Sequence, residues 1–452
     1  MDRYSLGLTF SRNKAQAVVY NIDSCKISNA VVLPCSQNEV VVHFLEVLEQ
    51  LFSKLVLEKA PLNQVAMIKC SGPENLAVCT NQNFYKNLMS FSAYAKSLAS
   101  HFQNSFTLDT LLVPSWGNLT ASKSCQKEHK SEFLLPETAL IFTLKSFVSN
   151  QSQIWDNTSN VQFFSAFINS ILAGKRSTID SSCAKISGLQ GEENLWNEQI
   201  CNGVAASLKT KLDQIKPSHE TFSYVSSYFV EKFGVYREAR IMPAGGNSAG
   251  SAKGSGGSVF LDTNDGCSLG AIVSQLPNGN GSFYVNGLVP GQFVCIVKSK
   301  YDLLLSQISA LEIVNDSMKN LYSSTVVTVS ESSVFKNAKF KLSDLIFSQL
   351  AEIKSNSKPF ESICVIGEYS ADPFFLQACA DLFATPIIVY ENSVFGTAIG
   401  NALSAARKIK ETAYEEVMNG YFKSISSQKF TPTNDGLNQM LSQLIAFGRQ
   451  TL

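Results

Sequence analysis

The strongest chemical signature in the sequence is a run of glycines and small polar residues from Met242 to Gly270, MPAGGNSAGSAKGSGGSVFLDTNDGCSLG. Glycine-rich loops bind phosphate through backbone N–H groups, and a Walker loop places Lys-Ser/Thr after its last glycine. Here Lys253 precedes its glycine, so the Walker pattern is absent, and we interpret Gly254 to Gly257 as a flexible surface loop. The triplet Asn264-Asp265-Gly266 suits a type I′ turn. The stretch therefore predicts a hairpin rather than a P-loop.

Metal binding and disulfide formation are not indicated by the other reactive residues. The four histidines lie far apart and show no metal-ligand spacing, so we expect no metal site. The eleven cysteines are an odd number without a CxxC pair, and several lie among apolar residues. We therefore interpret them as buried reduced thiols. The histidines are His43, His101, His129 and His219.

Composition indicates a globular protein with two or three domains. The chain has 452 residues, of which 45% are hydrophobic and 16% charged. This length and hydrophobic content are sufficient for two or three hydrophobic cores. Basic and acidic residues both number 37, so no overall field favours nucleic acid or an anionic membrane. No apolar run reaches the roughly 18 residues of a membrane helix, and the start MDRYSLGLTF has no signal-peptide core. We expect a cytoplasmic protein without nucleic-acid or membrane partners.

The elements that would position a site are clearest from Ser362 to Ala406, where the pattern predicts a βαβα unit. A short apolar run ends at Gly367, an amphipathic helix follows, and Pro386 opens a second strand. The helix from Gly396 to Ala406 then consists mostly of very small residues. Such a surface lets another backbone or a flat ligand come close.

The N-terminal part shows the same alternation of strands and helices. Residues 4 to 20 form two alternating apolar patterns joined by a polar turn at Ser11 to Lys14, which is a β-hairpin signal. A predicted helix from about Glu39 to Leu57 and a predicted strand from Val65 to Ile68 follow. The order of these elements indicates the α/β fold class.

In order and spacing, these segments resemble the FGGY carbohydrate kinases, and most of all the eukaryotic xylulokinases of that family. The resemblance implies an α/β, two-lobed fold of the actin-like, ribonuclease H-like ATPase class. An N-terminal lobe, residues 1–235, would form the sugar side, and a C-terminal lobe, residues 236–452, the nucleotide side. No single motif is intact. The segments that carry the resemblance are residues 4–20, 61–79, 111–125, 161–174, 228–247 and 363–406.

On the nucleotide side, the resemblance implies two phosphate-binding turns and an adenosine-binding turn, all altered here. The first hairpin of the family has an aspartate where this chain has Thr9, and its turn here contains Arg12 and Lys14, which we interpret as exposed, with contact to an anion as the alternative. The family's glycine-glycine-alanine turn corresponds to Gly367-Glu368-Tyr369-Ser370, so a carboxylate stands where no side chain is needed. The full set of nucleotide-side positions is Thr9, Ser11, Arg12, Asn264, Asp265, Gly266, Gly367, Glu368, Asn392 and Gly396.

On the sugar side, the positions implied by the resemblance have also changed. Glu74 and Asn75 stand where eukaryotic xylulokinases have a Gln-His pair that contacts the ketose. Trp116 is kept in the family's Trp-x-Asp segment, whereas Asn118 replaces the aspartate. Asparagine still hydrogen-bonds a hydroxyl but carries no charge. Residues Ser181 to Ile186 replace an acidic stretch, so weak sugar binding is the most that these residues indicate.

The general base is the most consequential of the altered positions. In the family, Pro-x-x-Gly-Asp-Asn supplies an aspartate that takes the proton from the substrate hydroxyl. Aligned on Pro243, the base position is Asn247, and a shift by one residue makes it Gly246, so neither register restores a carboxylate. Asp265, in the second phosphate-binding turn, would also place negative charge where phosphate oxygens approach.

Three hypotheses remain open. The first is a sugar kinase homologue that has lost phosphotransfer and acts by binding, either a sugar or nucleotide weakly or a protein partner; for it we expect no cofactor. The second is an active kinase of D-xylulose or a related sugar, which would use ATP and Mg²⁺ and recruit Asp262 or Asp265. The third is a subunit of a larger assembly, with apolar stretches such as Leu111 to Val113 as interfaces; we interpret that stretch as ordinary core.

Overall fold

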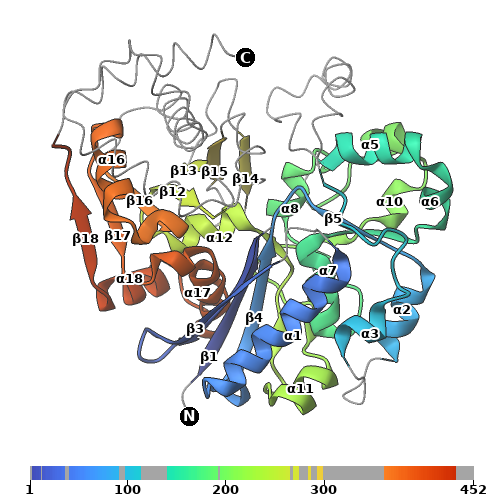
Figure 1. The fold of residues 1–452 in the computed structure, drawn as a ribbon, viewed down its shortest axis with the longest axis horizontal. Coiled ribbons are helices and arrows are strands. Elements are labelled where there is room, and N and C mark those ends of the chain that lie inside the picture. Colours follow the sequence, from blue (N-terminus) through green and yellow to red (C-terminus); the bar gives the residue numbers. More distant parts are fainter. Residues whose placement is uncertain are drawn as a thin grey trace, which may run out of the picture.

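The computed structural model describes residues 3–11, 13–35, 40–90, 97–113, 140–191, 194–264, 268–273, 283–286, 293–298 and 361–433. Within these residues the fold is mixed α/β and is built around two seven-stranded sheets (Figure 1). The predicted fold class is confirmed. Five of the predicted site residues lie outside the described part of the chain, namely Arg12, Trp116, Asn118, Asp265 and Gly266.

The first sheet has the strand order β3-β2-β1-β4-β10-β9, and β11 pairs with β4. The predicted hairpin is confirmed, because β1 and β2 pair antiparallel. The parallel pairing of β1 with β4 places Thr9 opposite Ser71. The strands are β1 (Tyr4–Phe10), β2 (Lys14–Asn21), β3 (Lys26–Pro34), β4 (Val65–Gly72), β9 (Ser223–Tyr224), β10 (Arg240–Ile241) and β11 (Gly245–Gly246).

The second sheet repeats the central pattern of the first, since its middle strand β12 pairs antiparallel with β13 and parallel with β16. This register places Thr263 opposite Gly367. The strands, in the order β14-β15-β13-β12-β16-β17-β18, are Phe283–Asn286, Phe293–Lys298, Ser268–Val273, Val259–Thr263, Ile363–Gly367, Ile387–Tyr390 and Ser427–Phe430.

Helices cover both sheets, and amphipathic spacing explains why they form. In α1, apolar residues at three- and four-residue intervals, such as Phe44, Leu48 and Phe52, face the core. The predicted helix, strand, helix order after Ile363–Gly367 is also confirmed. The helices are α1 (Val41–Leu57), α2 (Gln82–Met89), α3 (Leu98–Phe102), α5 (Leu140–Asn150), α6 (Ser152–Asn157), α7 (Phe164–Ala173), α8 (Ser181–Ile186), α9 (Glu198–Val204), α10 (Leu208–Lys211), α11 (Ser227–Phe233), α12 (Asn247–Gly254), α16 (Pro373–Phe383), α17 (Gly396–Lys410) and α18 (Tyr414–Ser424).

The small-residue helix α17 packs against the first sheet and against α12, in the middle of the molecule (Figure 1). A Cβ added at Gly7 of β1 would lie 2.0 Å from the Ala398 carbonyl oxygen, and one added at Gly254 of α12 would lie 1.7 Å from that of Gly396. The predicted close approach is therefore made by two protein backbones. Because Gly254 is buried in this contact, our interpretation of Gly254 to Gly257 as a flexible surface loop was wrong.

Smaller elements complete the fold beside the first sheet. Two short sheets pair β5 with β6 and β7 with β8, and their side chains enter a separate apolar core. Leu111 and Leu112 are buried, which confirms their interpretation as core. The short strands are β5 (Ala77–Thr80), β6 (Asn160–Phe163), β7 (Thr178–Ile179) and β8 (Gln214–Ile215).

Three further predictions concern whole regions of the chain. Eight cysteines are free, and all of these except the half-buried Cys25 are buried, as the sequence predicted. No helix in the described part of the chain is long and apolar enough to cross a membrane. Strands β10 and β11, which follow residue 235, pair within the first sheet, and the division of the chain at that residue stays a prediction.

Candidate functional site

Asn247, the predicted base position, lies at the first residue of α12, where the two sheets approach each other. Its side-chain oxygen accepts hydrogen bonds from Thr9 Oγ1 at 2.9 Å and Ser71 Oγ at 2.7 Å. Its Nδ2 donates to the Phe10 carbonyl oxygen at 2.7 Å. The amide is therefore held on both sides by the first sheet, and a neutral amide oxygen does not act as a proton acceptor in catalysis.

Asn401 of α17 extends this network from the other side. Its Nδ2 donates to Ser71 Oγ at 2.7 Å and to the Leu8 carbonyl oxygen at 2.8 Å. Thr9, predicted as a nucleotide-side residue, thus lies beside Asn247 in a network that joins α12, α17 and the first sheet. Asn401 and Ser71 were missed by the sequence analysis, because serine and asparagine in small-residue segments carry no distinguishing local signal.

Glu74 is buried and turned toward the start of α12 instead of toward solvent. Its Oε1 accepts a hydrogen bond from the Ser248 backbone N–H at 2.7 Å, so the carboxylate interacts with the positive end of the helix dipole. A Cβ added at Gly246 would lie 2.4 Å from Glu74 Cγ, which shows how completely this side chain fills the space. Neighbouring Asn75 is half-buried in the turn between β4 and β5.

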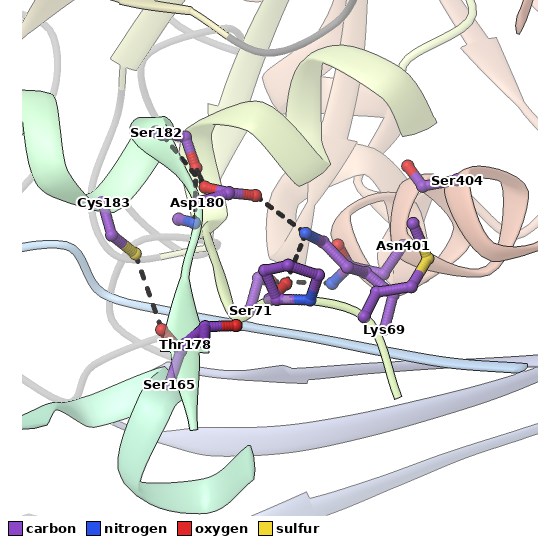
Figure 2. A network of polar contacts seen from close by, with 12 residues as sticks. Lys69, Ser71, Ser165, Thr178, Asp180, Ser182, Cys183, Asn401 and Ser404 are labelled. Atoms are coloured by element: carbon purple, nitrogen blue, oxygen red, sulfur yellow. Dashed lines mark hydrogen bonds and ion pairs between the residues drawn. The ribbon is translucent and has the colours of Figure 1, made fainter. Parts of the chain in front are cut away.

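A buried ion pair adjoins this cluster, as Figure 2 shows. Lys69 Nζ of β4 lies 2.7 Å from Asp180 Oδ2 and 2.6 Å from the Pro243 carbonyl oxygen, and both charged side chains are 3% exposed. Ser182 donates to Asp180 from its hydroxyl, and its oxygen accepts from Gly246 N–H at 2.9 Å. Asp180 immediately precedes Ser181 to Ile186, which the resemblance makes the counterpart of an acidic stretch, and that correspondence stays a prediction.

Cys183, also in Figure 2, is excluded as a nucleophile by its surroundings. The thiol is fully buried, and its sulfur lies 3.5 Å from Ser165 Oγ. Burial raises its pKa well above the usual value, and the nearby carboxylates of Asp180 and Glu74 raise it further. The thiol is therefore neutral, and a neutral thiol is a poor nucleophile.

The turn of the first hairpin is bound by a carboxylate from the second half of the chain. Glu368 Oε1 lies 3.0 Å from Lys14 Nζ and accepts a hydrogen bond from Asn13 Nδ2 at 3.0 Å. Ser11 Oγ in turn donates to Asn13 Oδ1 at 2.8 Å. Because Lys14 is buried in this contact, its interpretation as an exposed basic residue was wrong. Lys14 does meet an anion, but the anion belongs to the protein.

A second group of hydrogen-bonded polar side chains surrounds Asp262 at the end of β12. Asp262 Oδ2 accepts from Ser251 Oγ at 2.5 Å, and Oδ1 accepts from the Asn264 backbone N–H at 3.0 Å and from its Nδ2 at 2.8 Å. Asn264 Nδ2 also donates to Thr397 Oγ1 at 3.1 Å. Asp262 is half-buried, whereas the predicted alternative base Asp265 lies outside the described residues.

The other predicted nucleotide-side residues have structural roles. Gly367 has a φ of +93°, and a Cβ there would lie 2.7 Å from Thr263 Oγ1, so this turn requires glycine. Gly396 packs against Ile366, where an added Cβ would lie 2.7 Å from the isoleucine Cβ. Asn392 is exposed, with a left-handed backbone, before the short helix Ser393–Phe395.

The family resemblance implies ATP and Mg²⁺, and the described residues can be tested for their fit to these groups. Phosphate oxygens bind to N–H groups and cations, but the donors of the first turn, Asn13 and Lys14, already bind Glu368. In the described part of the chain, no three His, Cys, Asp or Glu side chains lie close enough together to hold a metal ion. The side-chain donors of Asn13 and Lys14, in the described part of this turn, are therefore not available to a phosphate group unless Glu368 is displaced.

Comparison with known proteins adds a family context to this geometry. No model of a protein family matches the chain. Among curated proteins, it is similar to xylulose kinase 2 of Arabidopsis thaliana, with 22% identity over 223 residues, which are 47% of this chain and 39% of that protein. It is also similar to xylulose kinase of Rattus norvegicus, with 21% identity over 289 residues, or 59% of this chain and 52% of that protein. The match thus spans about half or less of the length of these relatives.

Solved structures show the same fold over the whole chain. A xylulose kinase from Lactobacillus acidophilus superposes with a TM-score of 0.74 at 12% identity, covering 100% of this chain and 98% of that one. Glycerol kinase from Plasmodium falciparum gives a TM-score of 0.69 at 14% identity, with 100% and 98% covered. The fold is therefore the two-lobed actin-like fold of sugar kinases. The chain is therefore similar in fold to sugar kinases and in part of its sequence to two xylulose kinases, which are FGGY carbohydrate kinases.

Proposed function

We propose that this chain is a xylulokinase-like protein that no longer transfers phosphate and acts by binding. The observation that carries the proposal is the state of Asn247. It stands at the base position, its amide cannot take a proton, and three hydrogen bonds hold it in place. Loss of a general base alone lowers a rate by roughly 10² to 10⁴.

Two carboxylates inside the cluster support the same proposal. Glu368 binds the donors of the first hairpin turn, so it takes the place that a phosphate group would need. Glu74 binds the backbone at the start of α12, so its carboxylate is already engaged within the protein. Both carboxylates therefore bind groups of the protein itself, and these contacts stabilise an arrangement in which those groups are not open to a substrate.

An active ATP-dependent kinase of D-xylulose or a related sugar is the second candidate. It is favoured by the xylulose kinase relatives and by the position of Asp262. The Asp262 carboxylate accepts a hydrogen bond from Ser251, which lies about one helical turn after Asn247 in α12. In that case ATP and Mg²⁺ would be required, and Asp262 would act as the base or as a metal ligand.

A turnover assay with the full chain, ATP, Mg²⁺ and D-xylulose separates the two candidates. Because typical enzymes turn over at about 1–10³ s⁻¹ and the general base is missing, we expect turnover by the wild-type chain below about 10⁻² s⁻¹. The Asp262→Asn variant should give the same low rate. Turnover on the order of 1 s⁻¹ that disappears in Asp262→Asn would establish the kinase instead.

Binding of ATP tests the role assigned to Glu368. By calorimetry, we expect little ATP binding to the wild-type chain at millimolar ligand and stronger binding to Glu368→Ala, in which the donors of Asn13 and Lys14 are free. Equal ATP affinity in both proteins would show that Glu368 does not block the turn. Glu361→Ala, an exposed site before β16, is the matched control. The protein partner and the cytoplasmic location stay predictions.

A further inference from the structure

A cavity of about 220 Å³ lies beside the C-terminal half of α17. Of its lining residues, Met242, Lys253 and Tyr414 are buried, whereas His219 and Glu411 are exposed. The cavity therefore runs from the surface of the protein to a buried lysine. None of its lining residues belongs to the hydrogen-bond network around Asn247.

Among the described residues, Lys253 has no hydrogen-bond or ion-pair partner for its amino group. The residue is only 5% exposed, and its Nζ forms no hydrogen bond or ion pair with any residue that the structure describes. Only its backbone is engaged, because the Tyr414 hydroxyl donates to the Lys253 carbonyl oxygen at 3.0 Å. A buried ammonium group without a partner is costly, and proteins normally pair such a group or neutralise it.

The remaining charges around the cavity are mainly positive. Arg407 and Lys408 of α17 line it, and Glu411 is the one carboxylate among the lining residues. The Arg407 guanidinium also makes no hydrogen bond or ion pair within the described residues, although its planar group is well suited to phosphate oxygens. Lys253 and Arg407, neither of which has an ion-pair partner among the described residues, therefore line the same small cavity.

We propose that this cavity binds the phosphate group of a small organic phosphate monoester. Such a group carries about two negative charges near neutral pH, which matches Lys253 and Arg407 better than the single charge of a carboxylate does. Met242 and Tyr414 provide apolar wall for the organic part of the ligand. The cavity volume limits this ligand to a small molecule.

The proposed site is distinct from the cluster at the start of α12. Lys253 follows Asn247 by six residues, which corresponds to about 9 Å along the helix. Lys253 nevertheless lies near the Lys69–Asp180 ion pair, since both charges influence its pKa. An anion bound in the cavity would therefore contact Lys253, close to the Lys69–Asp180 ion pair, without entering the hydrogen-bond network around Asn247.

Calorimetric titration of the full chain with inorganic phosphate and with ribose 5-phosphate at pH 7 tests the proposal. We expect ribose 5-phosphate to bind more tightly than inorganic phosphate, and Lys253→Met and Arg407→Gln each to weaken binding by about tenfold or more. Lys410→Met, on the same helix but outside the lining, should bind like the wild type. Because Lys253→Met removes a buried unpaired amine, it should fold at least as stably as the wild type.

Three outcomes would overturn the proposal. The first is no binding of either probe at millimolar concentration. The second is equal affinity for both probes, which would leave no role for an organic part. The third is loss of binding in Lys14→Met with full binding in Lys253→Met, which would move the anion to the first hairpin turn.

The pH dependence of binding provides an independent readout. Burial, followed by the charge of Lys69, lowers the pKa of Lys253 to about 7, so the free protein loses this positive charge as the pH rises above 7. Between pH 7.5 and 8.5 the Kd of ribose 5-phosphate should rise about tenfold in the wild type and stay flat in Lys253→Met. A flat wild-type profile would contradict a role for the Lys253 ammonium. The charged or titratable groups that face Lys253 are Lys69, Asp180, Arg407, Lys408, Tyr414, His219 and Glu411.

Discussion

Glu368 Oε1 lies 3.0 Å from Lys14 Nζ and joins the turn after β16 to the turn of the first hairpin. The two side chains are 17% and 9% exposed, so water screens the pair only partly. Asn13 donates to the same carboxylate oxygen, which fixes its orientation. The contact thus ties the first and second sheets together.

Removing the charge of Glu368 should destabilise the protein, because Lys14 would remain buried without its counter-charge. In a double-mutant cycle of Glu368→Gln and Lys14→Met, we expect a coupling free energy of about 1–3 kcal/mol from urea unfolding. The exposed pair Arg3–Asp23, whose side chains are 50% and 42% exposed, serves as the control and should couple by less than about 1 kcal/mol. Equal coupling in the two pairs would show that the hairpin contact has no special role.

The contact between α12 and α17 should not tolerate a side chain at Gly254. A Cβ there would lie 1.7 Å from the Gly396 carbonyl oxygen, so the helices must separate. Gly254→Ala should lower the free energy of unfolding by about 3 kcal/mol or more. Gly203→Ala is the matched control, because nothing lies within 4 Å of its added Cβ in α9, and it should raise stability by roughly 0.5–1 kcal/mol. Similar effects at both glycines would contradict the close packing.

Lys69 should be far more important for stability than a surface lysine in an ion pair of similar length. Lys69→Met leaves Asp180 buried without its cation and should cost about 3–5 kcal/mol in urea unfolding. Lys209–Glu198 has a similar separation of 2.8 Å, but its side chains are 44% and 69% exposed. Lys209→Met should therefore cost no more than about 1 kcal/mol. A small loss for Lys69→Met would contradict a buried ion pair between Lys69 and Asp180.

Asp213 should give the protein an unusual dependence of stability on pH. Burial raises its pKa to about 6, although Arg176 and Gln162 oppose the shift. The folded state therefore holds this proton more tightly than the unfolded state, and the stability it contributes is present below about pH 4 and lost as the pH rises through 6. Relative to Asp213→Asn, the wild type should lose about 2–3 kcal/mol over that range.

The exposed carboxylate Asp23 is the control for this titration. Its pKa is lowered, mainly by a hydrogen bond from the Arg3 backbone N–H, so its contribution should have the opposite sign and be lost as the pH falls. Stability curves of wild type, Asp213→Asn and Asp23→Asn from pH 3.5 to 7.5 check both directions. Parallel curves for wild type and Asp213→Asn would show that the Asp213 carboxyl is not shifted.

The sequence by itself determined which elements form and in which order. Apolar alternation specified the first hairpin, and helical periodicity specified α1, because these patterns reflect which face of an element is buried. The run of small residues from Gly396 also indicated correctly that a backbone comes close. The absence of a carboxylate at residues 246 and 247 was likewise evident without a structure.

Only the tertiary structure decided which side chains meet. The sequence indicated that Lys14 was exposed and Gly254 flexible, but the first binds Glu368 and the second is buried against α17. Asp180 and Lys69 are 111 residues apart, so no local pattern could pair them. Periodicity encodes the burial of a face, whereas the partner of a buried charge depends on how distant segments pack. For that reason the filled state of the cluster around Asn247 could be seen only in three dimensions.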